Sequence, residues 1–208
     1  MLEFRIPFQV GFGIPLISWN QLEGPLPSFF SKALSLDLSD NKFSELDSFL
    51  CVTKASSLSF LNLSSSSLSG EAPDCWKPFK NLVFLDLSNN DFSGKIPTTM
   101  GFLVSTITLK LDHNKFEGEL PSSINNYKSL LLFDIGENKL SGLIPKWLGV
   151  GLPNLAFLIF WSNHFYGSIP LELCHLTYMQ ILDLSMNNIS GSIPKCLNNL
   201  TTLAEKGY

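Results

Sequence analysis

One pattern of apolar and polar positions recurs along the chain. Residues 82–97 read LVFLDLSNNDFSGKIP, with apolar side chains at Leu82, Leu85, Leu87, Phe92 and Ile96. When copies are aligned on the asparagine, successive copies follow at steps of 21, 25, 24, 24, 24, 25 and 24 residues. The aligned positions are Asn20, Asn41, Ser66 (a substitution), Asn90, Asn114, Asn138, Asn163 and Asn187. A near-constant period of this length indicates repeated structural units that stack on one another.

Each position of the pattern has a predicted structural role. Leu130, Phe133 and Ile135 point inward along a short strand, and the residues between them point outward. The asparagine that follows can bond backbone groups of neighbouring coils, which would otherwise be buried and unpaired. A glycine and a proline, such as Gly94 and Pro97, then suit the backbone of the return segment. Pattern and period together form the leucine-rich repeat signature, and they predict an α/β solenoid with a parallel concave sheet and an irregular or 3-10 convex side.

The pattern divides the chain into three parts. Residues 1–13 form an irregular segment, residues 14–203 hold about eight repeats, and residues 204–208 form a tail. The first repeat is degraded, because Pro15 stands where leucine is expected, so we expect its strand to be frayed. Neither end has a polar capping unit, which favours a fragment of a longer protein or a truncated gene product. We expect no signal peptide, since Pro7 interrupts residues 1–13, and no apolar run approaches the ~20 residues of a membrane span.

Charge and motifs exclude several function classes. The net charge is −4 and only 15% of residues are charged, which argues against nucleic-acid or anionic-membrane binding through a basic face. No nucleophile elbow, phosphate-binding glycine loop or HExxH motif is present, so we expect no enzyme, no cofactor and no metal. His113, His164 and His175 are far apart in repeat register, which favours surface histidines.

The four cysteines fall into two pairs in repeat register. Cys51 and Cys75 lie 10 and 9 residues after their aligned positions, and Cys174 and Cys196 lie 11 and 9 residues after theirs. Neighbouring strands are about 4.8 Å apart, and a disulfide needs a Cα separation of about 4.4 to 6.8 Å. The register predicts the disulfides Cys51–Cys75 and Cys174–Cys196. The alternative is four buried free thiols; a metal site is disfavoured because no C-x-x-C pair occurs.

Three triplets have the N-glycosylation pattern, beginning at Asn62, Asn188 and Asn199. Each alone arises easily by chance. Together with the paired cysteines they favour an oxidising, secretory route for the protein.

The outward positions of the concave strands form the candidate binding surface. One column of these positions carries the aspartate of an L-D-L-S consensus in four coils, which we interpret as structural: Asp37, Asp86, Asp134 and Asp183. Lys110, Asp112 and His113 interrupt this column with mixed charge, and one later strand places large apolar groups outward. Exposed aromatic side chains are enriched at recognition sites; the alternative for Trp161 is that it packs on its neighbours or under a glycan. The candidate ligand-binding residues are Phe84, Lys110, Asp112, His113, Glu137, Phe157, Ile159 and Trp161.

The repeat tail S-G-x-I-P resembles the plant extracellular class of leucine-rich repeats. Residues 69–76 (SGEAPDCW), 167–176 (GSIPLELCHL) and 181–201 (ILDLSMNNISGSIPKCLNNLT) resemble plant receptor-like proteins, in the group that includes receptors for a fungal ethylene-inducing xylanase. The resemblance implies a parent protein at the plasma membrane with a large repeat ectodomain, a non-repeat island, one membrane span and a short tail without a kinase. This chain would be a slice of that ectodomain on the extracellular side, without the signal peptide and the anchor.

The resemblance also implies a function. It is that of a segment that binds a peptide or protein ligand, working with a partner receptor kinase in defence or developmental signalling. The alternative is a secreted inhibitor of microbial wall-degrading enzymes, similar to polygalacturonase inhibitors and using the same concave face. A non-functional truncated gene product is a further alternative.

Overall fold

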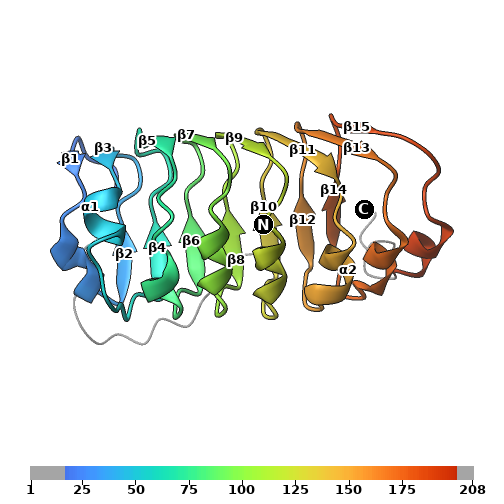
Figure 1. The fold of residues 1–208 in the computed structure, drawn as a ribbon, viewed down its shortest axis with the longest axis horizontal. Coiled ribbons are helices and arrows are strands. Elements are labelled where there is room, and N and C mark those ends of the chain that lie inside the picture. Colours follow the sequence, from blue (N-terminus) through green and yellow to red (C-terminus); the bar gives the residue numbers. More distant parts are fainter. Residues whose placement is uncertain (1–16, 201–208) are drawn as a thin grey trace.

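The computed structural model of the protein describes residues 17–200, which wind through successive coils (Figure 1). Pro15, the segment 1–13 and the tail 204–208 lie outside the described residues. From the coil of Asn41 onward, each described coil gives one three-residue strand to a parallel sheet, which we call the concave sheet. Its strands are β2 (Ser35–Asp37), β4 (Phe60–Asn62), β6 (Phe84–Asp86), β8 (Thr108–Lys110), β10 (Leu132–Asp134), β12 (Phe157–Ile159) and β14 (Ile181–Asp183). The predicted leucine-rich repeat solenoid is confirmed.

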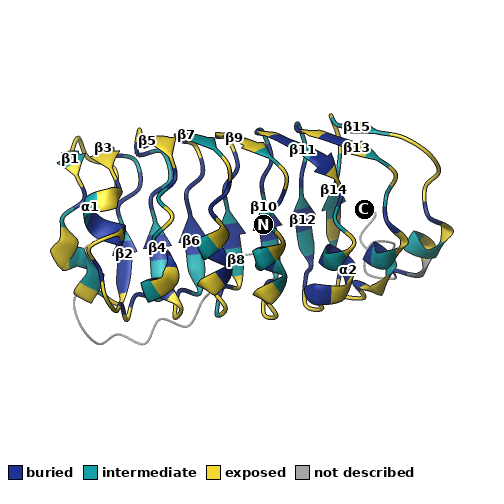
Figure 2. Ribbon diagram, in the orientation of Figure 1, coloured by how far each residue is buried: buried dark blue, intermediate teal, exposed yellow. Residues whose placement is uncertain are grey.

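The strand register brings equivalent residues of successive coils together. Leu109 of β8 is aligned with Leu85 on one side and with Phe133 on the other, and all three are fully buried. Figure 2 shows buried residues recurring in every coil, while exposed residues gather at the turns. One coil cannot shelter its own apolar residues, so the core is continuous along the solenoid.

The side opposite the concave sheet is more regular than the sequence predicted. A second parallel sheet follows the asparagine turns, and it runs along the top edge of the coils in Figure 1. Its strands are β5 (Ser69–Glu71), β7 (Asp91–Gly94), β9 (Lys115–Gly118), β11 (Lys139–Leu143), β13 (His164–Gly167) and β15 (Asn188–Ile189), and β1 (Glu23–Pro25) pairs separately with β3 (Lys42–Glu45). Gly94 has a φ of +70°, a left-handed conformation that glycine adopts without strain, so the repeated glycine fits this sheet.

The return segments complete each coil with short helices. The 3-10 helices are η1 (Ser28–Lys32), η2 (Lys77–Phe79), η3 (Thr98–Phe102), η4 (Ser122–Asn126), η5 (Leu171–His175) and η6 (Lys195–Asn199), and the α-helices are α1 (Asp47–Leu50) and α2 (Trp147–Gly151). Several 3-10 helices follow directly on the proline of the repeat, which fixes φ near −65° and has no N–H to satisfy. For η3 that residue is Pro97, with a φ of −61°.

The asparagine side chains link successive coils. Asn114 donates from Nδ2 to the carbonyl of Leu87 in the preceding coil at 2.9 Å and to two carbonyls of its own coil. Its Oδ1 accepts from the backbone N–H of Phe92 at 3.0 Å. At the substituted position the buried Ser66 hydroxyl contacts the carbonyl of Leu38 at 3.2 Å. The predicted role of this column in satisfying buried backbone groups is therefore confirmed.

Both predicted disulfides are present in the structure. Cys51 and Cys75 have Cα atoms 5.0 Å apart, and Cys174 and Cys196 have Cα atoms 5.7 Å apart. No free cysteine remains in residues 17–200, so the free-thiol alternative is wrong. Each bridge joins two adjacent coils on the side of the return segments.

Candidate functional site

The outward aspartates of regular coils close a turn. In β6, Asp86 Oδ1 accepts from the backbone N–H of Ser88 at 2.9 Å and from its hydroxyl at 2.6 Å. The same pair of bonds joins Asp37 to Ser39 and Asp183 to Ser185. These contacts support the structural interpretation of the consensus aspartates, because their acceptor atoms serve the chain's own backbone.

Three adjacent coils depart from this arrangement. In the coil of β8, Lys110 replaces the aspartate, and Asp112 replaces the serine. The coil of β10 keeps Asp134 but has Gly136 instead of serine, and the coil of β12 has apolar side chains at both positions. Lys110, Asp134 and Ile159 are aligned across the three strands. We use the name concave cluster for Asp86, Lys110, Asp112, His113, Asp134, Glu137 and Trp161.

Lys110 lies between two carboxylates of the concave cluster. Its Nζ is 3.4 Å from Asp86 Oδ2 and 3.7 Å from Asp112 Oδ1. Burial opposes the positive charge of Lys110, but the neighbouring carboxylates of Asp86, Asp112 and Asp134 outweigh it and raise its pKa. Lys110 is therefore held as a cation over the strand, with 30% of its side chain exposed.

Asp112 is less accessible than its register predicted. We expected an outward side chain, but the residue is only 6% exposed. It occupies the serine position, where the side chain folds into the turn, as the buried Ser88 does in the preceding coil. Asp112 Oδ2 contacts His113 Nδ1 at 2.9 Å, while Oδ1 is buried without a hydrogen-bond donor in residues 17–200.

His113 bridges two carboxylates. Its Nδ1 faces Asp112 and its Nε2 lies 3.1 Å from Glu137 Oε2. The contact with Asp112 is a hydrogen bond, whereas the contact with Glu137 is a close approach of a ring nitrogen to a carboxylate. A neutral imidazole has one N–H, so both ring nitrogens carry a proton toward a carboxylate only when the ring is an imidazolium. His113 and Glu137 both have left-handed backbones, with φ values of +52° and +47°, and this turn directs the two side chains toward each other. His113, His164 and His175 are all exposed, as predicted, but His113 also belongs to an interacting group.

Trp161 forms the apolar wall of the cluster. Its indole meets the His113 ring edge-on, with ring centres 5.9 Å apart at 71°. A Cβ at Gly136 would lie 2.3 Å from Trp161 Nε1, so the indole lies where any larger residue at 136 would stand. Trp161 thus packs partly on its neighbours, as the alternative held, but it keeps intermediate exposure.

Asp134 carries a perturbed carboxyl group. Its Oδ1 accepts from the backbone N–H of Gly136 at 3.0 Å, but glycine offers no hydroxyl for a second bond. Burial, followed by the negative charge of Asp112, raises the pKa of Asp134 to about 6. The ionised form is therefore less favourable in the folded protein than in the unfolded chain.

We expect Asp134→Asn to stabilise the protein at pH 7.5 but not at pH 4. The folded pKa of about 6 exceeds the ordinary 3.8, so stability falls as pH rises from about 4 to about 6 and stays reduced above that. Asparagine keeps an acceptor for Gly136 and removes the charge. Discounted for the partial exposure of the group, we expect a gain of about 1 kcal/mol at pH 7.5, measured by urea unfolding. An equal effect at both pH values would contradict this explanation.

The structure brings some predicted residues together and separates others. Lys110, Asp112, His113, Glu137 and Trp161 meet in the concave cluster, with Ile159 beside Asp134. Phe84 and Phe157 lie at the beginnings of β6 and β12, in the row of first outward positions. Phe84 stacks on Phe60 of β4 with ring centres 4.4 Å apart and rings inclined by 11°.

Sequence reasoning missed three members of the site's surroundings. Asp86 and Asp134 were interpreted as structural consensus residues, although Asp86 also binds Lys110 and Asp134 is perturbed. Gly136 was assigned an outward position without a role, although it makes room for the indole of Trp161. The signal available in the sequence was Asp-x-Gly where the regular coils have Asp-x-Ser.

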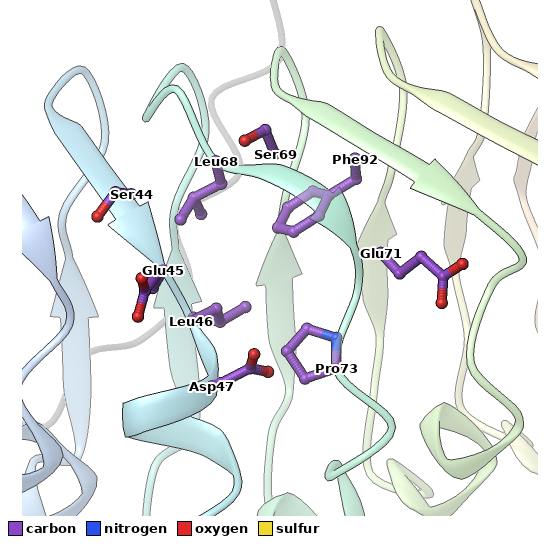
Figure 3. Close-up of a pocket in the computed structure, with 9 residues that line it drawn as sticks. All are labelled: Ser44, Glu45, Leu46, Asp47, Leu68, Ser69, Glu71, Pro73 and Phe92. Carbon is purple, nitrogen blue, oxygen red and sulfur yellow. The ribbon is translucent and has the colours of Figure 1, made fainter.

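A hollow on the return-segment side is too small for a peptide. Figure 3 shows it between the segment from β3 to α1, which contributes Glu45 and Asp47, and β5, which contributes Ser69 and Glu71. Its volume is about 60 Å³, enough for a few water molecules.

Two of the predicted glycosylation positions are described in the structure. Asn62 lies on β4 of the concave sheet, where its Oδ1 accepts from the backbone N–H of Ser64 at 3.1 Å and from its hydroxyl at 2.8 Å. Asn188 is exposed on β15. Asn199 ends η6, and N-glycosylation at all three positions stays a prediction.

No helix within residues 17–200 is long and apolar enough to cross a membrane. Over that range, no three His, Cys, Asp or Glu side chains are grouped so that they could hold a metal ion.

Comparison with known proteins supports the repeat assignment. The family model described as Leucine Rich Repeat matches residues 81–103, 105–127 and 178–200. No curated protein sequence matched the chain. Among solved structures, the BIR3–SERK2 complex of Arabidopsis thaliana matches with 37% identity and a TM-score of 0.58, over 65% of this chain and 72% of that chain. The chain belongs to the leucine-rich repeat family.

Longer leucine-rich repeat ectodomains match over more of this chain. The ectodomain of the Arabidopsis thaliana receptor kinase GASSHO1/SCHENGEN3, solved with CASPARIAN STRIP INTEGRITY FACTOR 2, has 32% identity and a TM-score of 0.78, covering 88% of this chain. The Arabidopsis receptor kinase HAESA, solved with the peptide hormone IDA and the co-receptor SERK1, has 37% identity and a TM-score of 0.76, covering 86% of this chain. This leucine-rich repeat chain spans only 22% and 30% of those two chains. The fold is thus that of a segment of a plant receptor ectodomain.

Proposed function

We propose that this chain is the ligand-binding leucine-rich repeat segment of a plant cell-surface receptor, with a peptide or protein as its ligand. The observation that carries the proposal is the contiguous departure from consensus on β8, β10 and β12, which gathers Lys110, His113, Glu137 and Trp161 on one part of the concave sheet. A purely structural repeat would keep the regular Asp-Ser turn there. The ectodomains that it matches include several solved with peptide ligands.

A finer assignment rests on the sequence alone. The stretches 69–76, 167–176 and 181–201 favour the receptor-like group that includes receptors for a fungal ethylene-inducing xylanase. In that assignment the parent protein lies in the plasma membrane, exposes these repeats outside the cell and works with a partner receptor kinase in defence or development. The two disulfides support an oxidising compartment. The matched structures are receptor ectodomains, so they give no support to the inhibitor alternative.

The proposal is tested by selecting ligands and then changing the concave sheet. Peptides selected from a displayed random library against the whole chain are measured one by one by titration calorimetry. We expect Trp161→Ala and His113→Ala each to weaken binding at least about tenfold, because central aromatic and charged side chains dominate interface energies.

Tyr178→Ala provides the matched control. Tyr178 is 60% exposed and lies in a return segment, away from the concave sheet. Its removal is expected to leave the affinity of the same peptides within about twofold, a difference below 0.5 kcal/mol. Peptides that bind Trp161→Ala as tightly as the unchanged protein, or a library that gives none that bind, would overturn the proposal.

A further inference from the structure

The concave cluster carries more negative than positive charge. Its acids are Asp86, Asp112, Asp134 and Glu137, against Lys110 and one histidine. Four carboxylates against one lysine leave an excess of three negative charges when the histidine is neutral and of two when it is protonated. Lys110 serves two carboxylates at once, so neither has a cation of its own.

One carboxylate oxygen of the cluster has no donor of its own. Asp112 Oδ1 is buried and accepts no hydrogen bond from residues 17–200, and its nearest cation, Lys110 Nζ, stays 3.7 Å away. A buried acceptor without a donor costs about 1 to 3 kcal/mol, more when it is charged. This charge is therefore only partly compensated within the chain, and it also raises the pKa of its neighbour Asp134.

Accessible acceptors lie beside that buried charge. Asp134 receives one N–H, from Gly136, and is of intermediate exposure. The Glu137 side chain is 42% exposed, and its Oε2 atom pairs with His113 Nε2. Asp134 accepts from Gly136, which lies against the indole of Trp161, and Glu137 pairs with His113, whose ring meets the same indole. Both carboxylates are therefore linked to Trp161 through one intervening residue each.

The indole of Trp161 favours one kind of cation at the concave cluster. An indole face attracts cations, and a guanidinium stacks on it through its flat surface. The guanidinium also has five N–H donors in a fork that matches carboxylates, whereas an ammonium is a compact point charge. An aromatic wall next to two partly exposed carboxylates therefore favours arginine over lysine.

We propose that the concave cluster binds the guanidinium group of an arginine side chain of the ligand, against Trp161 and paired with Asp134 and Glu137. The buried charge of Asp112, which contacts Lys110 and His113 of the same cluster, adds to the attraction. Lys110 is then a positioning residue that holds Asp86 and Asp112 in place. This inference rests on the proposed function, since it assigns a chemistry to the ligand of the same face.

The test adds a small arginine compound to the whole 208-residue protein. N-acetyl-arginine amide is titrated into the ¹⁵N-labelled protein, and the indole N–H signal of Trp161 is followed by NMR. The signal is assigned by its loss in Trp161→Phe. We expect a saturable shift with the arginine compound and at least about tenfold weaker binding of N-acetyl-citrulline amide, which has the same shape without the charge. An equal response to both compounds, or no shift with arginine, would overturn the inference.

Charge-neutral variants provide the second readout. Asp134→Asn combined with Glu137→Gln is expected to abolish the arginine-dependent shift while the protein stays folded. The matched control is Glu117→Gln with Glu119→Gln, which removes two exposed carboxylates on and next to β9 of the second sheet. An arginine shift that survives the first pair of changes would place the guanidinium elsewhere.

The library selection separates this inference from the proposed function. Selected peptides that need Trp161 but contain no arginine would leave the proposed function intact and defeat the arginine inference. A library that yields no peptide, combined with a saturable and charge-dependent arginine shift, would defeat the proposed function and leave the cation site.

Discussion

Asn138→Ala is expected to lower the free energy of unfolding by about 3 to 5 kcal/mol, because it leaves several buried backbone groups without partners. Asn138 Oδ1 accepts from the N–H of Phe116 at 2.9 Å, and Nδ2 donates to the carbonyl of Leu111 at 3.0 Å and to two carbonyls of its own coil. Alanine replaces none of these bonds, and water cannot easily reach them because Asn138 is 8% exposed. Urea unfolding followed by circular dichroism measures the loss.

Asn154→Ala is the control for this change. Asn154 is exposed, and its Nδ2 donates to a single carbonyl, that of Lys128, at 2.9 Å. A carbonyl at the surface finds water when its partner is removed, so we expect a loss below about 1 kcal/mol. Similar losses for the two variants would show that the buried asparagines do not carry the connection between coils.

Phe133→Ala is expected to cost about 3 to 5 kcal/mol for a different reason, since it opens a cavity in the continuous core. Phe133 is fully buried on β10 and meets the Phe160 ring at 87° with centres 5.4 Å apart. Its strand neighbour Leu132 points to the concave side and is of intermediate exposure. We expect Leu132→Ala to cost about 1 kcal/mol, because the partly exposed Leu132 side chain buries less apolar surface on folding.

Thermal and urea unfolding of both variants test the predicted alternation of the strand. The difference between adjacent positions depends mainly on which face each residue occupies, and in part on the larger size of the phenylalanine side chain. A larger loss for Leu132→Ala than for Phe133→Ala would mean that the inward and outward assignments of β10 are reversed, and the concave cluster would then be assigned to the wrong face.

The fold could be predicted because the same pattern of apolar positions occurs in many successive coils. Inward positions such as Leu109 and Phe133 recur at a constant step. A position that is ambiguous in one coil can therefore be assigned from its equivalents in the other coils. The disulfides followed from the same register, since Cys51 and Cys75 occupy nearly equivalent places in adjacent coils. The second sheet was missed because the residues around the repeated glycine lack the apolar alternation that predicts a strand. The strands of this sheet are defined by their pairing with neighbouring coils.

The site could be predicted only in part. Lys110, His113 and Trp161 stood out because they break a consensus, and register placed them within three successive coils, those of β8, β10 and β12. The burial of Asp112 could not be predicted, since it depends on how a side chain folds into a turn that usually holds a serine. The roles of Asp134 and Gly136 depend on contacts across coils, such as the indole over Gly136, that one coil's sequence does not contain.

The two cross-links also affect how the array resists being pulled apart. In a stack of repeats without covalent links, the terminal repeat unfolds first, because it contacts only one neighbour. Cys174–Cys196 fastens the last pair of described turns together, and Cys51–Cys75 does the same near the opposite tip. The two coils joined by a bridge therefore cannot separate from each other, and the coils that hold Lys110 and Trp161 lie between two such linked pairs.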